Sequence, residues 1–129
     1  MNQVYLILAL HNHQPVGNFN HVFEEACSRA YQPFLETLEK YPRIRIVVHY
    51  SGSLLEWLYT YKPNLFEKLR SLVKRGQVEV LGGGFYEPIM VMLPERDRLR
   101  QIHTYSHWLK DRLGVEVRGI WLAERVWEQ

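Results

Sequence analysis

Four short apolar runs divide the sequence, and each leads at once into polar residues. The runs cover residues 4–10, 44–48, 78–81 and 119–122. Helical patterns lie between them, and this alternation favours parallel strands, because two parallel neighbours need a long crossover connection. The carboxyl ends of parallel strands meet at one edge of a sheet, where α/β proteins bind their ligands. The four polar sets are therefore expected to converge at that edge.

Apolar residues between the runs recur at intervals of three and four, which is typical of helices that bury one face. The first such stretch covers residues 22–39, where Pro33 is expected to bend or divide the helix. A second helix is interrupted by Pro63, and a third ends at Gly76. The last helix is expected over residues 97–113. The first apolar run shows no polar alternation, which predicts a strand buried on both faces.

Composition excludes several classes of protein. The 129 residues carry 16 basic and 14 acidic side chains, and a formal charge of +2 gives no reason to expect a nucleic-acid or membrane partner. The single cysteine cannot form an intramolecular disulfide. Residues 4–10 are too few to span a bilayer, and no charged leader with a cleavage site precedes them. The sequence predicts a soluble cytoplasmic protein.

A small nucleotide-binding domain is disfavoured by the residues after the first and third runs. Residues 11–15 replace the glycine-rich fingerprint expected after a first strand. Gly82, Gly83 and Gly84 lead to Glu87, whose carboxylate would repel a phosphate. The sequence ends soon after the fourth run, at about half the 250 residues of a (β/α) barrel. We therefore expect an α/β fold that is part of such a barrel, with about four parallel strands and intervening helices.

Three ordered motifs carry a family resemblance. They are His-Asn-His-Gln-Pro at 11–15, Gly-Gln-Val-Glu-Val at 76–80 running into Gly-Phe-Tyr-Glu-Pro at 84–88, and Gly-Ile-Trp-Leu-Ala-Glu-Arg-Val-Trp at 119–127. The chain resembles glycoside hydrolase family 57, closest to its 4-α-glucanotransferase and α-amylase branch. The resemblance implies a seven-stranded (β/α) barrel, of which residues 1–129 form the N-terminal portion and the second half is absent. It also implies retaining chemistry on α-1,4-glucans and no nicotinamide or nucleotide cofactor. We expect no other cofactor and no metal.

The resemblance assigns the nucleophile to Glu124, which also lies just beyond the fourth run, where catalytic residues of barrels lie. The alternative is that Glu124 has no catalytic role and is a surface glutamate paired with Arg125 or Arg118. The family's general acid is an aspartate in a fourth region that this sequence does not contain. Retaining chemistry needs two carboxyl groups. We therefore expect the chain to be inactive without the missing barrel half. The incomplete sheet also leaves strand edges unpaired, so we expect self-association, aggregation or marginal stability.

The remaining site residues are expected to contact or orient an α-glucan or maltooligosaccharide. They are His11, His13, Glu79, Tyr86, Glu87, Trp121 and Arg125. Either histidine could instead be satisfied by a backbone carbonyl, and Glu87 could be a solvated loop carboxylate. Glu79 lies inside an apolar run, so its burial would require a partner. Of the two tryptophans in the third motif, Trp127 is expected in the core.

Two other functions stay open. His11 and His13 could ligate a metal, as in the deacetylases and α-mannosidases of a related barrel, although no aspartate accompanies the pair. A non-catalytic glucan-binding or vestigial fragment is the second alternative. The sequence does not distinguish hydrolysis from transfer, and it does not indicate the preferred glucan length.

Overall fold

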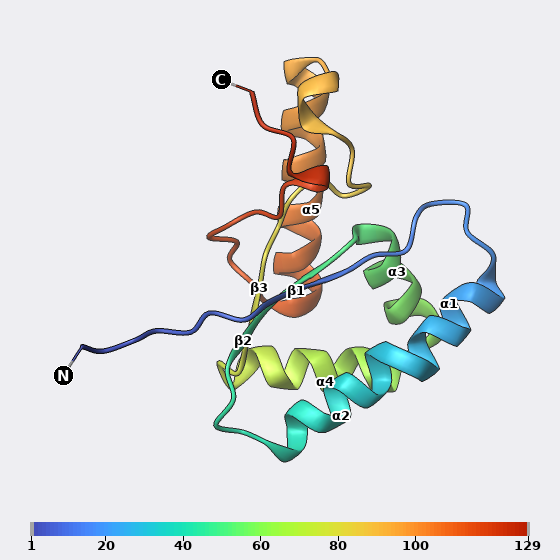
Figure 1. Ribbon diagram of the computed structural model, residues 1–129. Coiled ribbons are helices and arrows are strands. Elements are labelled where there is room, and N and C mark those ends of the chain that lie inside the picture. Colours follow the sequence, from blue (N-terminus) through green and yellow to red (C-terminus); the bar gives the residue numbers. More distant parts are fainter. Residues whose placement is uncertain (1, 129) are drawn as a thin grey trace.

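The computed structural model describes residues 2–128 as an α/β fold built on a parallel sheet. The sheet holds strands β1 (Ala9–Asn12), β2 (Ile46–Tyr50) and β3 (Val78–Val80), in that spatial order (Figure 1). Both neighbouring pairs are parallel, and helices form the connections between them. The expected fold class is confirmed.

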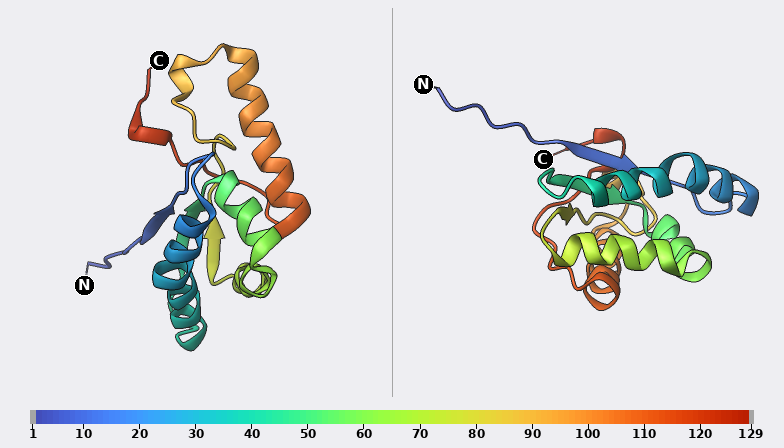
Figure 2. Two further views of the ribbon diagram at one scale, coloured as in Figure 1. Left: turned by 90° about the vertical axis from the view of Figure 1, so that its right-hand side faces the viewer. Right: turned by 90° about the horizontal axis from the view of Figure 1, so that it is seen from below.

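Helices gather on one side of the strands (Figure 2). They are α1 (Asn20–Ala26), α2 (Gln32–Lys40), α3 (Gly52–Tyr61), α4 (Pro63–Lys74) and α5 (Glu95–Leu113), with a π-helical turn η1 (Cys27–Tyr31) and two short 3₁₀ turns, η2 (Met90–Met92) and η3 (Ala123–Arg125). This one-sided arrangement leaves the opposite face of the sheet for the polar residues.

The strand register separates the two faces of the sheet. Ala9 lies opposite Val47, and Val47 lies opposite Glu79. Successive side chains of a strand point to opposite faces. Alternate strand residues therefore form the main core with the helices, and these are Ile46, Val48, Tyr50, Val78 and Val80. The other face carries Ala9, His11, Val47, His49 and Glu79, so both strand histidines share it.

Pro33 divides the first predicted helix, as expected. It occupies the first turn of α2, directly after the wider turn η1. Proline lacks the N–H that would bond back to the preceding turn, and its ring crowds the carbonyl four residues earlier. A π-helical turn accommodates this local mismatch without ending the helical path.

The other helix boundaries follow proline and glycine. Pro63 opens α4, and Gly76 follows its end with a φ of +72°. Gly114 ends α5 in the left-handed conformation, at a φ of +70°. Glycine has no Cβ, so it adopts this conformation without steric cost. These stops match the sequence predictions, while α5 begins two residues earlier than expected.

The prediction that the first apolar run forms a strand buried on both faces is wrong. Strand β1 begins only at Ala9, and Val4, Leu6 and Ile7 are more than three-quarters exposed. The cause is the length of its partner, because β2 begins at Ile46. Residues before Leu8 therefore have no strand opposite them. The expected self-association through unpaired strand edges stays a prediction.

The fourth run also differs from the expected strand. Residues 119–122 form a single parallel bridge, between Gly82 and Ile120, rather than a ladder. Two hydrogen bonds hold this bridge, from Gly82 N to Gly119 O and from Trp121 N to Gly82 O, each 2.9 Å. The segment thus takes the position of a fourth parallel strand, after β3.

Within residues 2–128, we find no helix with the length and apolar character that crossing a membrane requires.

We predict that a buried hydroxyl fixes α5 against the sheet. Tyr105 is fully buried on α5 and donates a hydrogen bond to the carbonyl oxygen of Tyr50, at the end of β2. Tyr105→Phe should lower the free energy of unfolding by about 1–2 kcal/mol, because a buried carbonyl loses its partner. Urea unfolding followed by circular dichroism measures this loss. Tyr61→Phe, at a 60% exposed position, is the control and should change stability by less than about 0.5 kcal/mol. Equal losses in the two variants would contradict the role.

Candidate functional site

Side chains from three separate segments meet at the carboxyl edge of the sheet. His11 lies on β1 and His49 lies opposite it on β2. Their Nδ1 atoms are 2.9 Å apart, so one imidazole donates a hydrogen bond to the other. Glu87 reaches the pair from the loop after β3. The predicted convergence of polar residues at this edge is confirmed for these segments.

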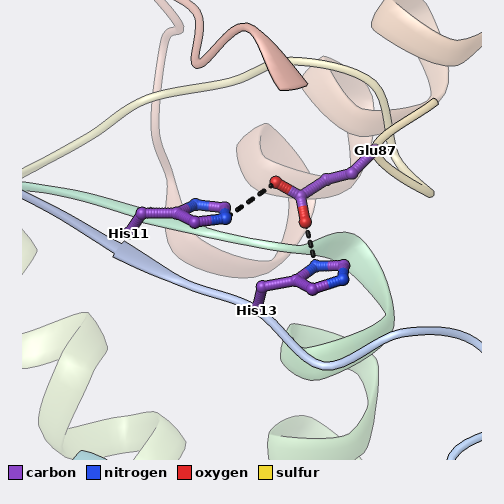
Figure 3. A group of neighbouring side chains, drawn as sticks. All are labelled: His11, His13 and Glu87. Carbon is purple, nitrogen blue, oxygen red and sulfur yellow. Dashed lines mark ion pairs between the residues drawn. The ribbon is translucent and has the colours of Figure 1, made fainter. Parts of the chain in front are cut away.

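Glu87 lies at the centre of this cluster. Its Oε1 atom is 3.4 Å from His11 Nε2 and 3.5 Å from His49 Nδ1. Its Oε2 atom contacts Nδ1 of His13, which follows β1 (Figure 3). The Glu87 side chain is only 7% exposed. It is therefore a buried carboxylate among three imidazoles, and the alternative of a solvated loop glutamate is wrong.

His49 is a site residue that the sequence motifs did not assign. It is fully buried, and it contacts both His11 and Glu87. The signal that could have found it is its place at the polar end of the second apolar run. Since a strand-end histidine between apolar neighbours also suits an ordinary core position, the sequence alone gives it no role.

Trp121 covers the histidine cluster. Its ring stacks on His11 with centroids 4.4 Å apart and planes within 5°. It lies 5.9 Å from the His49 ring as well. Gly83 permits this approach, because a Cβ built there would lie 2.9 Å from the Trp121 carbonyl oxygen. One face of the indole is thus occupied by imidazole.

Glu124 lies on the short turn η3 and is exposed, in contrast to Glu87. Its backbone has a φ of +54°, and that of Arg125 is +57°. Left-handed conformations are uncommon outside glycine and are enriched at functional sites. The charge of Glu124 acts on His11, His13 and Glu87, so the two glutamates belong to one electrostatic cluster.

Burial keeps the imidazoles neutral at physiological pH. It lowers the pKa of His49 to about 3, with smaller contributions from the neighbouring His11 and His13. Burial also lowers the pKa of His11 and of His13, while the Glu124 charge opposes the shift in both. Neutral imidazoles each offer one donor and one acceptor nitrogen. The cluster can therefore hydrogen-bond a polar ligand without carrying a net positive charge.

The pKa of the Glu87 carboxyl is shifted in the opposite direction. Burial, reinforced by the negative charge of Glu124, raises its pKa to about 7. The imidazoles around Glu87 are mostly neutral, so they do not offset this cost as cations would. Near neutral pH the contact between Glu87 and His13 is therefore weaker than a full ion pair.

The structure also places sequence-predicted residues outside the cluster. Glu79 is exposed on β3, on the sheet face that carries His11, so the expected burial with a partner is wrong. Tyr86 is 53% exposed and packs edge-on against Phe85. Trp127 is 68% exposed, which corrects its expected place in the core. Residues 119–128 pair with the sheet through a single bridge, and this leaves the far end of the segment uncovered.

The donor atoms of His11, His13 and Glu87 also fit a metal ion by chemistry and spacing. One ligand atom from each residue lies within 4.8 Å of the other two. Among the residues that the structure describes, no other group of this kind is found.

Comparison with known proteins places this arrangement in context. The family described as "Glycosyl hydrolase family 57" matches residues 7–129. A 4-α-glucanotransferase of Thermococcus kodakarensis is 52% identical over 128 residues, and an α-amylase of Pyrococcus furiosus is 50% identical over 127. The crystal structure of 4-α-glucanotransferase from Thermococcus litoralis superposes with a TM-score of 0.91 at 50% identity, over 95% of this chain. In each case the match spans 19% of the relative's length.

We predict that Glu87 makes stability fall between about pH 4.5 and 7. Below this window the carboxyl is protonated in both the folded and the unfolded chain. As pH rises, the unfolded chain releases the proton near its ordinary pKa of 4.5, whereas the folded chain retains it until about 7. The stability of Glu87→Gln relative to wild type should therefore rise by about 2 kcal/mol across the window. Urea unfolding at half-unit pH steps measures it.

The control for this experiment is Glu56→Gln, at an exposed position on α3. It should follow the wild-type curve. A constant difference between Glu87→Gln and wild type from pH 4.5 to 7 would contradict the proposed protonation of Glu87.

Proposed function

The chain belongs to glycosyl hydrolase family 57, and from this premise we propose that it is the nucleophile-bearing portion of a retaining enzyme acting on α-1,4-glucans. Its relatives named 4-α-glucanotransferase and α-amylase are about half identical to it. Hydrolysis and transfer would share their first step, because both pass through a glycosyl–enzyme intermediate and differ only in the acceptor. The substrate class is an α-glucan or maltooligosaccharide.

The observation that carries this proposal is the difference between the two glutamates of the cluster. Glu124 is exposed on its turn, whereas Glu87 is buried with both oxygens directed at imidazoles. A nucleophile must reach the anomeric carbon, so exposure favours Glu124. The raised pKa of Glu87 lets this carboxyl become neutral near pH 7, which reduces the electrostatic repulsion between the two glutamates.

The surrounding residues would bind and orient the sugar. His13 has a 37% exposed side chain, and its ring is held by Glu87 on one side. An imidazole fixed in this way can donate to or accept from a ring hydroxyl. Trp121 would contribute through its edge or free face, since His11 covers the other face. Tyr86, Glu79 and Arg125 are exposed around this region and would contact parts of the glucan farther from the reacting bond.

Besides the nucleophile, a retaining enzyme needs a carboxyl group that protonates the leaving oxygen. This acid lies about 5 to 5.5 Å from the nucleophile. The family resemblance assigns it to an aspartate in a region that this sequence does not contain. Glu87 is a poor substitute, because its oxygens already contact His11 and His13. We propose that the acid comes from polypeptide corresponding to the rest of the relatives' length, which this chain matches over 19%.

The proposed compartment is the cytoplasm. The single cysteine, Cys27, is free and buried. A lone unpaired thiol fits a reducing compartment.

We predict that Glu124→Gln abolishes turnover while leaving sugar affinity nearly unchanged. The test is a chimera in which this chain replaces the matching segment of the Thermococcus kodakarensis 4-α-glucanotransferase. The substituted amide keeps the size of the side chain but cannot form the glycosyl–enzyme bond, so kcat should fall by roughly a thousandfold or more. Activity on maltoheptaose and calorimetric binding of maltooligosaccharides measure the two effects.

The matched control is Glu116→Gln in the same chimera, because Glu116 is an exposed glutamate bonded to Lys110. Its activity should equal that of the parent chimera. Wild-type turnover by the Glu124→Gln chimera would remove Glu124 from the role of nucleophile.

The isolated 129-residue chain should have no measurable activity on maltoheptaose, because one accessible carboxylate cannot both attack the sugar and protonate the leaving group. Product analysis after prolonged incubation tests this, with the active parent chimera as the positive control. Turnover by the isolated chain that Glu124→Gln eliminates would show that the acid lies within these residues.

A further inference from the structure

We propose that His11, His13 and Glu87 form a binding site for a divalent transition metal of the zinc class. The two histidines come from β1 and the residues after it, and the glutamate comes from the loop that follows β3 (Figure 3). The three donors therefore converge from segments more than 70 positions apart in sequence. Metal binding would crosslink the carboxyl end of β1 to this loop.

The spacing of the donor atoms suits a metal. All three lie within 4.8 Å of one another. Zinc binds nitrogen and oxygen at about 2.0–2.2 Å in tetrahedral geometry, which puts neighbouring ligand atoms about 3.4 Å apart. His11 Nε2 and Glu87 Oε1 are 3.4 Å apart, so this pair already has the separation of two ligands. His13 Nδ1 lies closer to the other carboxylate oxygen, and a small ring rotation would open that contact.

An unpartnered oxygen independently marks the position. Oε1 of Glu87 accepts no hydrogen bond within the described residues, although the side chain is more than nine-tenths buried. This oxygen points into the cluster, toward His11 and His49. A buried carboxylate oxygen without a donor is costly. A bound cation would satisfy it directly.

His49 can orient the His11 ring as a metal ligand. His49 Nδ1 is 2.9 Å from His11 Nδ1 and 3.5 Å from Oε1 of Glu87, so it belongs to the same cluster. When His11 donates its Nδ1–H to His49, its Nε2 lone pair is free and faces Glu87. Metal-bound histidines regularly donate their second nitrogen in this way, which fixes the tautomer. Stacking on Trp121 holds the same ring in plane.

The donor set selects among cations. Two imidazoles and one carboxylate suit zinc and its transition-metal neighbours, whereas calcium and magnesium prefer oxygen ligands. The His11 and His13 side chains are 29% and 37% exposed, so an ion can enter from solvent. This inference rests on the proposed function in one respect. The metal would bind to the same side chains that face the sugar, so metal and sugar would exclude each other.

Calorimetric titration of the untagged 129-residue chain with zinc chloride at about pH 7.5 tests the site. The wild type should bind one zinc ion, and excess calcium should not compete. His13→Ala and Glu87→Gln should each weaken zinc binding by more than about tenfold. Loss of a residue that only hydrogen-bonds to a metal ligand already weakens binding by about this factor. Circular dichroism of each variant checks that the fold is retained.

The control addresses a second histidine pair. His103 and His107 lie one turn apart on α5 with ring centroids 6.3 Å apart, so they could chelate zinc as well. The double variant His103→Ala/His107→Ala should bind zinc as tightly as wild type. Loss of binding in this double variant alone, or no saturable binding by wild type, would overturn the proposal.

A measurement on the wild type keeps the test independent of variant folding. Zinc should shift the ¹⁵N resonances of the His11 and His13 rings and leave those of His103 and His107 unchanged. Shifts confined to the α5 pair would refute the site. Neither experiment uses sugar turnover, so the result stands apart from the outcome for Glu124.

Discussion

The pairing of His11 with His49 across β1 and β2 is the constraint on which the site depends. The two residues are opposite each other in a parallel register, and both lie on the sheet face opposite to the one that carries Val48 and Tyr50. A shift of one residue would turn His11 toward the core and bring an apolar neighbour into the cluster. The register is held because Ile46, Val48 and Tyr50 are buried against the helices, which forces the intervening residues to the other face. The geometry of the polar cluster is thus a consequence of apolar packing on the opposite side of the same strands.

The neutral state of the three histidines also explains why the buried Glu87 carboxyl has a raised pKa. Charged imidazoles would attract Glu87 strongly, but burial lowers their pKa and removes most of that attraction. The carboxyl responds by holding its proton to about pH 7. The exposed Glu124 adds a negative charge at the margin of the cluster, which reinforces the pKa shift of Glu87. Protonation is consequently a property of the whole group of side chains, and a change at one position is expected to alter the titration of the others.

Local sequence signals predicted the helices well and the strand ends poorly. Pro33, Pro63 and Gly114 act through their own backbone chemistry, so their effects could be read without knowing the fold. The convergence of His11 and Glu87 followed from strand order alone. By contrast, the exposure of Val4 depends on where β2 begins, and that of Glu79 depends on what covers the polar sheet face. The role of His49 required three-dimensional contacts with residues 38 positions away. Such properties arise from partners that no local pattern specifies.

The left-handed backbone at Glu87 and Glu124 has an evolutionary consequence. With φ values of +52° and +54°, both positions would accept glycine with less strain than the glutamates that occupy them. Substitution of either glutamate by glycine would therefore relieve backbone strain and remove an acidic group. Glutamate at either place therefore opposes the conformational preference of the backbone, and such a conflict between stability and chemistry is common at catalytic sites. A copy of the chain under no selection for that chemistry would be expected to drift toward glycine or asparagine at these two turns.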